Sequence, residues 1–307
     1  MERLKIAVTG ASGFVGSNVA RYLSKNNDVV GLTRSPNGWR ADGIKVERLD
    51  VCDRDKVISM LKELRPDVLI HCAVYGGYHF QNDTENVIKT NILGTLNLLD
   101  ASKDIPLFIN TGSSSEYGIK QMPMKESDLL EPNTDYAMSK ALVSNLLQAR
   151  KSIGKTVTLR LFSVYGYYEE KHRLICTLLY SLIKRERPKL SSPDNVRDFV
   201  FVDDVSRAYE RVIKNSNRIS NGEVFNVGSG IQSKISEVVE MLGVDVIWDN
   251  SARGPEEKRV WQADITKIKG EIGWNPEISL KEGLKMTKEW MEKNIAFYER
   301  DENEKHR

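Results

Sequence analysis

A tyrosine and a lysine stand four positions apart in the segment Tyr136 to Ala149, whose apolar residues recur at helical spacing. Residues four apart lie on one face of a helix, so the phenol of Tyr136 and the ammonium of Lys140 are expected within reach of each other. A nearby cation favours the phenolate form of tyrosine. The pair therefore predicts acid–base chemistry at a phenolic oxygen.

Hydroxyl groups gather upstream of this pair. The apolar run Leu107 to Thr111 leads into a loop from Gly112 to Asn133 that begins with Ser113, Ser114 and Ser115. If the run is a strand, these hydroxyls lie over the same cleft as Tyr136. A tyrosine and a lysine at this spacing also occur on surface helices by chance, but the serines and a glycine loop near the N-terminus favour a catalytic site.

That glycine loop follows the first apolar run, Leu4 to Thr9, and precedes a helical pattern. Glycines at such spacing form a tight turn, let backbone amides approach a pyrophosphate at the helix N-terminus, and allow the helix to pack closely on the strand. The sequence therefore predicts a dinucleotide site. Its residues are Gly10, Ser12, Gly13, Phe14, Val15 and Gly16.

The end of the second apolar run indicates which dinucleotide binds. About twenty residues past the glycines, NAD-binding proteins usually present Asp or Glu to the ribose hydroxyls. Here the run ends in Thr33, Arg34 and Ser35. A guanidinium beside two hydroxyls suits a 2′-phosphate, so NADP is favoured and NAD is the alternative. The other interpretation of Arg34 is a solvated loop residue that stacks on the adenine.

Further cofactor contacts are expected where the next strands end. Asp50 and Val51 follow the third strand, and Cys72 and Ala73 end the fourth, where the adenine and the middle of the cofactor should pass. His71, beside them, is interpreted as a packed histidine and not as a catalyst. The other predicted cofactor contacts are Tyr75, Asn91, Leu161, Tyr136 and Lys140.

The elements that must position these residues alternate along the first half of the chain. Short β-branched runs alternate with helical patterns, which is typical of βαβ units and a parallel sheet. Strands are predicted at Leu4 to Thr9, Val29 to Thr33, Ile44 to Leu49, Val68 to Ala73, Leu107 to Thr111 and Val157 to Leu161, and helices at Val15 to Leu23, Val57 to Leu64, Val87 to Leu99 and Tyr136 to Ala149. The predicted fold is α/β, a Rossmann-type doubly wound parallel sheet.

The alternation stops after Ser163. We predict a dinucleotide-binding Rossmann domain over residues 1–163 and a smaller, discontinuous C-terminal substrate lobe over residues 164–298, parts of which return to the Rossmann domain. Residues 299–307 are nearly all charged and are expected to form a frayed tail.

Composition excludes several classes of protein. The 45 Lys and Arg residues nearly balance 43 Asp and Glu, so nothing indicates a nucleic-acid partner. The longest apolar stretch, around Val68 to Val74, is far shorter than the roughly 18 residues of a membrane span, so we expect a cytoplasmic protein without a membrane partner. The three cysteines, Cys52, Cys72 and Cys176, are widely spaced and indicate neither a disulfide framework nor a metal site.

These motifs together resemble the extended short-chain dehydrogenase/reductases, specifically the NAD-dependent epimerase/dehydratase family that acts on nucleotide sugars. The resemblance covers nearly the whole chain. Beyond the glycine loop and the tyrosine–lysine pair, it rests on Asn91 to Leu99, Arg160 to Gly166, Arg197 to Val205, Phe225 to Gly230 and Ala263 to Lys267. It implies a nucleoside-diphosphate sugar as substrate and a homodimer formed through the helices Val87 to Leu99 and Tyr136 to Ala149.

The resemblance also implies roles for single residues. Ser113 would hydrogen-bond the reacting sugar oxygen, Tyr136 would be the acid/base, and Lys140 would lower the pKa of that tyrosine and hold the nicotinamide ribose. Arg197 would bind the substrate diphosphate, helped by Arg253 from the C-terminal lobe, although Arg253 fits a surface charge equally well. The other implied substrate contacts are Ser114, Ser115 and Ser163.

Departures from the family pattern narrow the chemistry. The 4,6-dehydratases carry an acid and a base directly after the catalytic hydroxyl, where this chain has Ser114 and Ser115. Glu116 falls one place later, and on an extended segment it should point away from the substrate. Epimerase/reductases of the fucose-synthase type need a Cys and a His, where this chain has Ser115 and, approximately, Arg173. Both reactions are therefore disfavoured.

Hydride chemistry at one sugar carbon, C4, remains. An NADPH-dependent 4-ketoreductase of a 4-keto-6-deoxy nucleotide sugar is favoured by Arg34, and a 4-epimerase with tightly held NAD is the alternative. A third hypothesis is a non-catalytic cofactor sensor or an RNA-binding relative. Because the chain keeps the serine, tyrosine and lysine and has no basic patches, this hypothesis is the least favoured.

Overall fold

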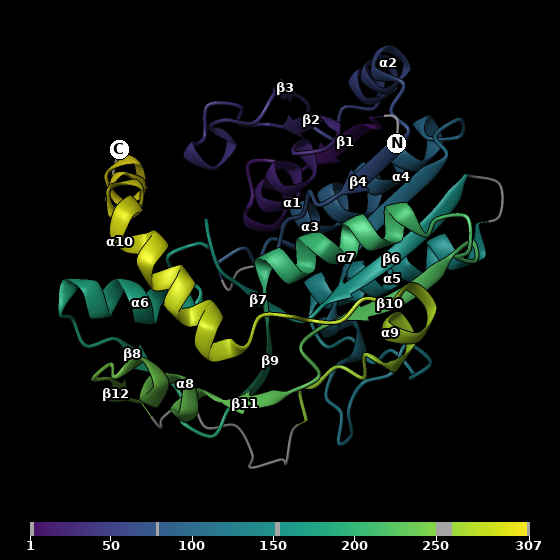
Figure 1. Ribbon diagram of the computed structural model, residues 1–307. Coiled ribbons are helices and arrows are strands. Elements are labelled where there is room, and N and C mark those ends of the chain that lie inside the picture. Colours follow the sequence, from purple (N-terminus) through teal and green to yellow (C-terminus); the bar gives the residue numbers. More distant parts are fainter. Residues whose placement is uncertain (1–2, 78–79, 151–153, 250–259, 306–307) are drawn as a thin grey trace.

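A seven-stranded, wholly parallel sheet dominates the computed structural model, which describes residues 3–77, 80–150, 154–249 and 260–305 (Figure 1). Its strands, in spatial order, are β10 (Glu223–Val227), β6 (Lys155–Leu161), β5 (Leu107–Ser113), β4 (Val68–His71), β1 (Lys5–Thr9), β2 (Asp28–Thr33) and β3 (Val46–Arg48). The strand order reverses between β1 and β4. Doubly wound sheets bind ligands where the order reverses, beyond the carboxyl ends of the strands. The predicted Rossmann-type fold is confirmed.

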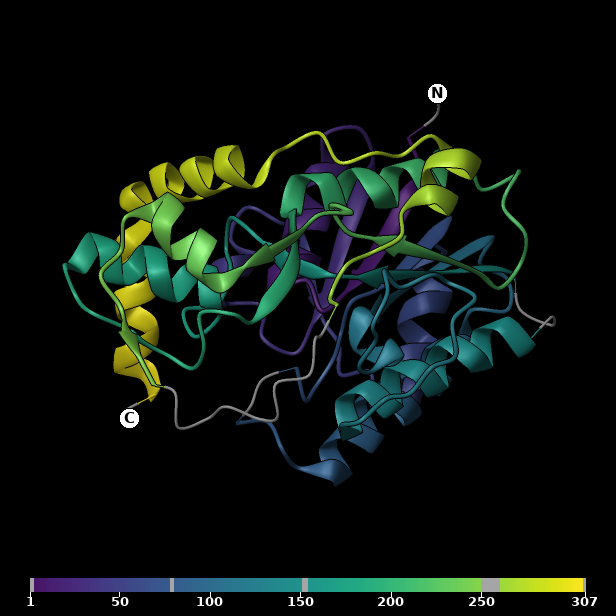
Figure 2. The ribbon, with the colours of Figure 1, turned by 90° about the horizontal axis from the view of Figure 1, so that it is seen from below.

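Helices cover both faces of the sheet (Figure 2). One face carries α1 (Phe14–Ser24) and α7 (Val202–Lys214), and the other carries α2 (Arg54–Leu64), α4 (Gly94–Ala101) and α5 (Asp135–Ala149). Successive strand residues face opposite sides, so Ile6 and Val8 enter the core below α1 and α7, whereas Ala7 enters the core on the other face. Two apolar layers thus hold the carboxyl ends of the strands in place.

Several predicted elements differ from the structure in detail; the fourth strand, for example, ends at His71 and not at Ala73. The third strand begins at Val46 and not at Ile44, because Gly43 has a positive φ of 71° and the Ile44 N–H bonds to the Ala41 carbonyl, which keeps this part in a turn. The single helix predicted over Val87 to Leu99 is divided. It consists of α3 (Thr84–Val87), a π-helical segment η2 (Ile88–Leu93) and α4.

The second half of the chain adds smaller sheets and helices around a separate apolar core. Its strands are β7 (Ser163–Tyr165), β8 (Lys189–Leu190), β9 (Val196–Phe201), β11 (Gln232–Lys234) and β12 (Ile247–Trp248), and its helices are α6 (Leu174–Lys184), α8 (Ile235–Leu242) and α10 (Leu280–Lys305). The remaining helix, α9 (Thr266–Ile272), packs Ile268 and Ile272 into the core of the main sheet. Because β10 joins the main sheet beside β6, this half also completes the first. The domain boundary at residue 163 stays a prediction.

The frayed, charged tail predicted over residues 299–307 is wrong for most of its length. The helix α10 continues to Lys305 (Figure 1). In the described part of the chain, no helix combines the length and the apolar character needed to cross a membrane.

Candidate active site

A cavity of about 640 Å³ opens at the carboxyl edge of the main sheet. It brings together residues of β2, β5, β6, β7 and β9 with the first turns of α1 and α5, which lie far apart in the sequence. From the predicted cofactor set it is lined by Gly10, Ser12, Gly13, Phe14, Val15, Gly16, Thr33, Arg34, Ser35, Asp50, Val51, Cys72, Ala73 and Leu161, and from the predicted catalytic and substrate sets by Ser113, Tyr136, Lys140, Ser114, Ser115, Ser163 and Arg197.

The glycine loop has the geometry of a phosphate-binding turn. Gly10 has a φ of 69°, and a Cβ there would lie 2.6 Å from the Ala73 nitrogen, so another residue would not fit. A Cβ on Gly16 would lie 2.3 Å from the Gly10 carbonyl oxygen. Gly13 precedes α1, and among the described residues no side chain caps the first turn of this helix. The backbone therefore fits the pyrophosphate of a dinucleotide.

At the far end of the cavity, the hydroxyls of Ser12 and Thr33 hydrogen-bond each other at 2.5 Å. The Ser35 N–H donates to the Thr33 hydroxyl at 3.2 Å, which shapes the turn after β2. Arg34 and Ser35 are exposed at the rim. Arg34 thus places a cation at the edge where an adenosine ribose would lie.

Tyr136 and Lys140 occupy the first turns of α5, which Thr134 caps by accepting the Ala137 N–H at 3.1 Å. The Lys140 ammonium donates to the Thr111 carbonyl at 2.8 Å and lies 6.0 Å from the centre of the Tyr136 ring. The Ser113 hydroxyl accepts the Ser115 N–H at 3.1 Å. Ser113 also forms a side-chain hydrogen bond with Tyr136, which acts to lower the pKa of the phenol. The two hydroxyl groups are therefore in contact at the cavity wall.

Burial governs the charges of this group. Burial raises the pKa of Tyr136, and the negative charge of Glu116 acts in the same direction, whereas a hydrogen bond with Ser113 and the charge of Arg173 act to lower it. The further lowering that the resemblance implies for Lys140 stays a prediction. Burial also lowers the pKa of Lys140 to about 8. Tyr136 therefore holds its proton at neutral pH.

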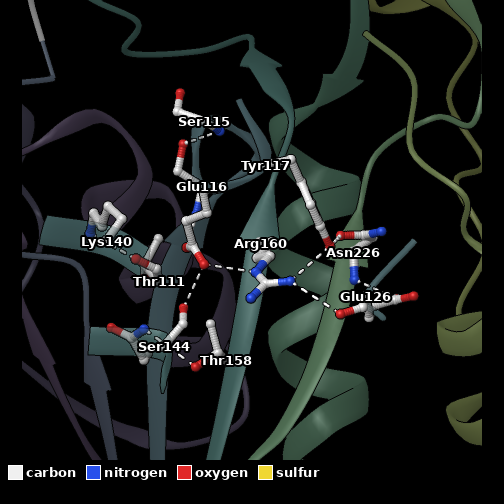
Figure 3. Close-up of polar contacts among 12 residues, drawn as sticks. Thr111, Ser115, Glu116, Tyr117, Glu126, Lys140, Ser144, Thr158, Arg160 and Asn226 are labelled. Atoms are coloured by element: carbon white, nitrogen blue, oxygen red, sulfur yellow. Dashed lines mark hydrogen bonds and ion pairs between the residues drawn. The ribbon is translucent and has the colours of Figure 1, made fainter. Parts of the chain in front are cut away.

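Glu116 points away from the cavity, as predicted, but from a different backbone. It lies in the 3-10 turn η3 (Ser114–Tyr117) and not on an extended segment. Its carboxylate is fully buried, and Oε2 lies 2.7 Å from the Arg160 Nε (Figure 3). Ser114 and Ser115 line the cavity in its place.

A second cavity, of about 290 Å³, continues from the first. Both cavities are lined by Ser163, Val164, Arg173 and Arg197. The Arg197 guanidinium is exposed and lies 5.3 Å from the centre of the Trp261 ring. Arg253, the other arginine that the resemblance suggested, lies outside the described residues.

The buried side chain of Asp198 connects the motif Arg197 to Val205 with the motifs Phe225 to Gly230 and Ala263 to Lys267, which are distant in the sequence. Its carboxylate accepts the backbone N–H groups of Ser229, Gly230 and Ala263 at 2.6, 3.0 and 2.9 Å. One buried side chain on β9 therefore holds the segments that carry Ser229, Gly230 and Ala263.

Arg173 is a cavity residue that the sequence analysis did not include among its site residues. Its Nε pairs with Glu169 at 2.9 Å, its Nη2 donates to the Val164 carbonyl at 2.9 Å, and its charge favours the Tyr136 phenolate. The available signal was the spacing of Glu169 and Arg173, four apart and directly after the motif Ser163 to Gly166.

Two predicted cofactor contacts, Tyr75 and Asn91, do not line the cavity. The Asn91 amide bonds the backbone of Tyr75 in both directions, at 2.8 Å each, and donates to the Ser139 hydroxyl at 2.9 Å. Asn91 therefore shapes the loop after β4 and ties it to α5.

His71 is a packed histidine, as predicted. Its ring nitrogens lie 2.8 and 2.9 Å from the hydroxyls of Thr9 and Thr95, and burial lowers its pKa to about 3.

Comparison with known proteins identifies the family. The profile of the NAD dependent epimerase/dehydratase family matches residues 6–228, and the chain belongs to this family. It is 28% identical to a putative UDP-glucose 4-epimerase of Methanocaldococcus jannaschii over 94% of this chain and 99% of the relative. It is 28% identical to the GDP-6-deoxy-D-mannose reductase of Pseudomonas aeruginosa (92% and 95%) and 26% identical to the dTDP-glucose 4,6-dehydratase of Salmonella typhimurium (96% and 94%).

Solved structures show the same fold with ligands. The UDP-glucose 4-epimerase of Thermotoga maritima, with UDP-glucose, superposes with a TM-score of 0.86 at 26% identity, over 95% of this chain and all of the other. The UDP-glucuronic acid 4-epimerase of Bacillus cereus, with UDP-glucuronic acid and NAD, has a TM-score of 0.84 at 26% identity with the same coverage.

Proposed function

We propose that the protein is an NADPH-dependent reductase of a nucleoside-diphosphate 4-keto-6-deoxy sugar, acting at C4. The observation that carries the proposal is the meeting of Ser113 and Tyr136 at the wall of a cavity that also holds Lys140, with exposed Arg34 at its rim. The similarity to a GDP-6-deoxy-D-mannose reductase supports the same reaction class.

A nicotinamide cofactor, which the glycine loop and Lys140 would hold, would supply the hydride for the carbonyl carbon. Tyr136 donates its proton to the oxygen, so that a ketone becomes an alcohol, and its raised pKa favours the protonated phenol that this step needs. Ser113 hydrogen-bonds the same oxygen and orients it. Arg197 and Arg173, at the junction of the two cavities, suit the diphosphate of the substrate.

A 4-epimerase that keeps NAD bound is the second candidate. Its support is the similarity to the putative UDP-glucose 4-epimerase and to the two epimerase structures, one of which holds NAD. In that reaction Tyr136 would accept a proton as the alcohol is oxidised and return it on reduction. The nucleotide released from the purified protein distinguishes the two candidates. Tightly bound NAD is expected of the epimerase, because only the epimerase keeps its cofactor through each turnover.

Dehydration is disfavoured by the surroundings of Glu116. Removal of the C5 proton needs a base within hydrogen-bond reach, and the side chains at the cavity wall after Ser113 are the neutral hydroxyls of Ser114 and Ser115. The next carboxylate in the sequence, that of Glu116, is buried and paired with Arg160. This argument applies even though a 4,6-dehydratase is among the relatives.

We also propose a homodimer through the face formed by η2 and α5. Four large apolar side chains on it are about half exposed: Ile88, Leu93, Met138 and Leu142. An apolar cluster of this kind is typical of a protein interface. A second copy of the chain is the partner that the family resemblance implies.

Product analysis tests the proposed reaction. Incubation with a nucleotide-activated 4-keto-6-deoxy sugar and NADPH should consume the cofactor, whereas nucleotide-activated glucose should give no 4-keto-6-deoxy product. Formation of that product from unmodified glucose would overturn our interpretation of the serine loop. Interconversion of two hexose epimers without net use of NADPH would replace the reductase by the epimerase.

If Arg34 contacts a 2′-phosphate, NADPH should bind at least tenfold more tightly than NADH. Arg34→Asp should erase or reverse that preference, because a hydrogen bond to a charged group contributes about 1.5 to 3 kcal/mol. Fluorescence titration with both cofactors measures the effect. Arg48→Asp, at an exposed arginine on β3 that does not line the cavity, is the matched control and should keep the preference. Equal affinities in the unaltered protein would contradict the assignment.

A further inference from the structure

The carboxylate of Glu116 lies behind the serine loop and contacts three different elements (Figure 3). Its Oε1 accepts the backbone N–H of Ser113 at 2.8 Å, and its Oε2 accepts hydrogen bonds from the Arg160 Nε and the Ser144 hydroxyl, each at 2.7 Å. The side chain is 0% exposed, so these contacts replace water completely. Glu116 therefore connects the end of β5 with α5 and with β6.

Its contact on α5 lies in line with the proposed catalytic pair. Ser144 stands four positions after Lys140 and eight after Tyr136, so the three side chains share one face of the helix. Ser113 is the residue that the same carboxylate holds through its backbone. The Glu116 carboxylate thus links the end of β5 to α5. The distance between these two elements determines whether Ser113 and Tyr136 reach the same substrate atom.

The strand is adapted to admit this carboxylate. A Cβ on Gly112 would lie 2.6 Å from the Glu116 Oε1 and 2.8 Å from the Thr158 Cγ2, so a larger residue would displace the acid. Arg160 is held in turn, because its Nη1 donates to the Tyr117 hydroxyl at 2.9 Å, and that hydroxyl donates to the Asn226 Oδ1 on β10 at 2.7 Å. The carboxylate is therefore anchored through Arg160 to β10.

We propose that Glu116 is a positioning residue, which fixes the serine loop against the helix face that carries Tyr136 and Lys140. A buried ion pair is rarely more stabilising than apolar residues of the same shape, so this pair is better explained by the geometry that it imposes. The negative charge of Glu116 also adds to the raised pKa of Tyr136, and at Lys140 it opposes the larger lowering caused by burial. The inference rests on the proposed function for the identity of the reacting groups.

Three variants separate positioning from general stability. Glu116→Gln should lower kcat at least tenfold and change the KM for the nucleotide sugar less than twofold, because the binding groups lie elsewhere. Ser144→Ala keeps the charge and removes one contact, so it should lower kcat by a smaller factor. Thr158→Val is the control: it removes a buried hydrogen bond with Asn110 on the neighbouring strand, and we expect a lower Tm with kcat unchanged.

A second measurement needs no substrate. Absorbance titration of the tyrosines, with Tyr136→Phe to assign the signal, follows the ionisation of Tyr136 in the folded protein. Glu116→Gln should move this ionisation to lower pH, because a negative charge that opposes the phenolate is lost, whereas Thr158→Val should leave it in place. This result would support the inference even if the proposed substrate were wrong.

The inference is overturned if Glu116→Gln keeps both the kcat and the Tyr136 titration of the unaltered protein. It is also overturned if kcat falls in all three variants in proportion to Tm, since that is the behaviour of a purely structural residue. If the unaltered protein reduces no keto sugar, the proposed function fails, and the titration alone decides the role of Glu116.

Discussion

Replacement of Tyr136 by phenylalanine is expected to lower kcat by about 10² to 10⁴ and to leave cofactor affinity almost unchanged. The ring keeps its packing, but the oxygen that we propose as the proton donor is gone. Single-turnover oxidation of NADPH measures the rate, and fluorescence titration measures the affinity. A phenylalanine variant that turns over normally would remove Tyr136 from the mechanism.

Lys140→Ala is the companion variant and should differ in a diagnostic way. Because Lys140 is expected to hold the nicotinamide ribose, its loss should lower both kcat and cofactor affinity. Its ammonium also donates to the Thr111 carbonyl at 2.8 Å, so a thermal melt must show that the variant is folded. A Lys140→Ala protein with full cofactor affinity would limit this residue to the proton transfer.

Replacement of Arg160 by methionine is expected to lower the free energy of unfolding by about 3 to 5 kcal/mol, because it leaves the Glu116 carboxylate buried without its cation. Arg160 is 1% exposed and Glu116 is 0% exposed, so water cannot replace the missing partner. Urea denaturation at neutral pH measures the loss. A decrease below about 1 kcal/mol would be typical of a surface ion pair and would contradict this account.

The loss should depend on pH in a defined direction. Burial already raises the pKa of Glu116, and removal of the arginine raises it further. A carboxyl whose pKa is higher in the folded state than in the unfolded state stabilises the fold below the unfolded value and loses this contribution as pH rises through the folded value. The difference in stability between Arg160→Met and the unaltered protein should therefore shrink in acid and grow towards neutral pH.

A double variant is the control for this pH dependence. Glu116→Gln combined with Arg160→Met removes both charges, so its stability relative to the unaltered protein should recover at neutral pH compared with Arg160→Met alone. The stability loss of the double variant should also not shrink in acid, as that of Arg160→Met does. If the free energies of unfolding of the single and double variants change with pH in the same way, a group other than Glu116 causes the pH dependence.

The sequence alone determined the fold class and most of the residues that line the cavity. The glycine loop, the serine cluster and the tyrosine–lysine pair are local patterns, and apolar periodicity reports which residues face a sheet or a core. In a doubly wound sheet the carboxyl ends of the strands meet at one edge, so knowledge of the strands was enough to bring Gly10, Arg34, Ser113 and Tyr136 to one cavity.

Only the tertiary structure decided the surroundings of these residues. Asn91 contacts Tyr75 and Ser139 instead of the cavity, Arg173 reaches the site from a loop, and burial together with Glu116 raises the pKa of Tyr136. The buried contacts of Glu116 were likewise invisible in the serine motif. Burial and hydrogen-bond partners depend on residues distant along the chain, and both set the charge that a side chain carries. Local patterns therefore predict where a group lies, and packing decides its protonation and its partners.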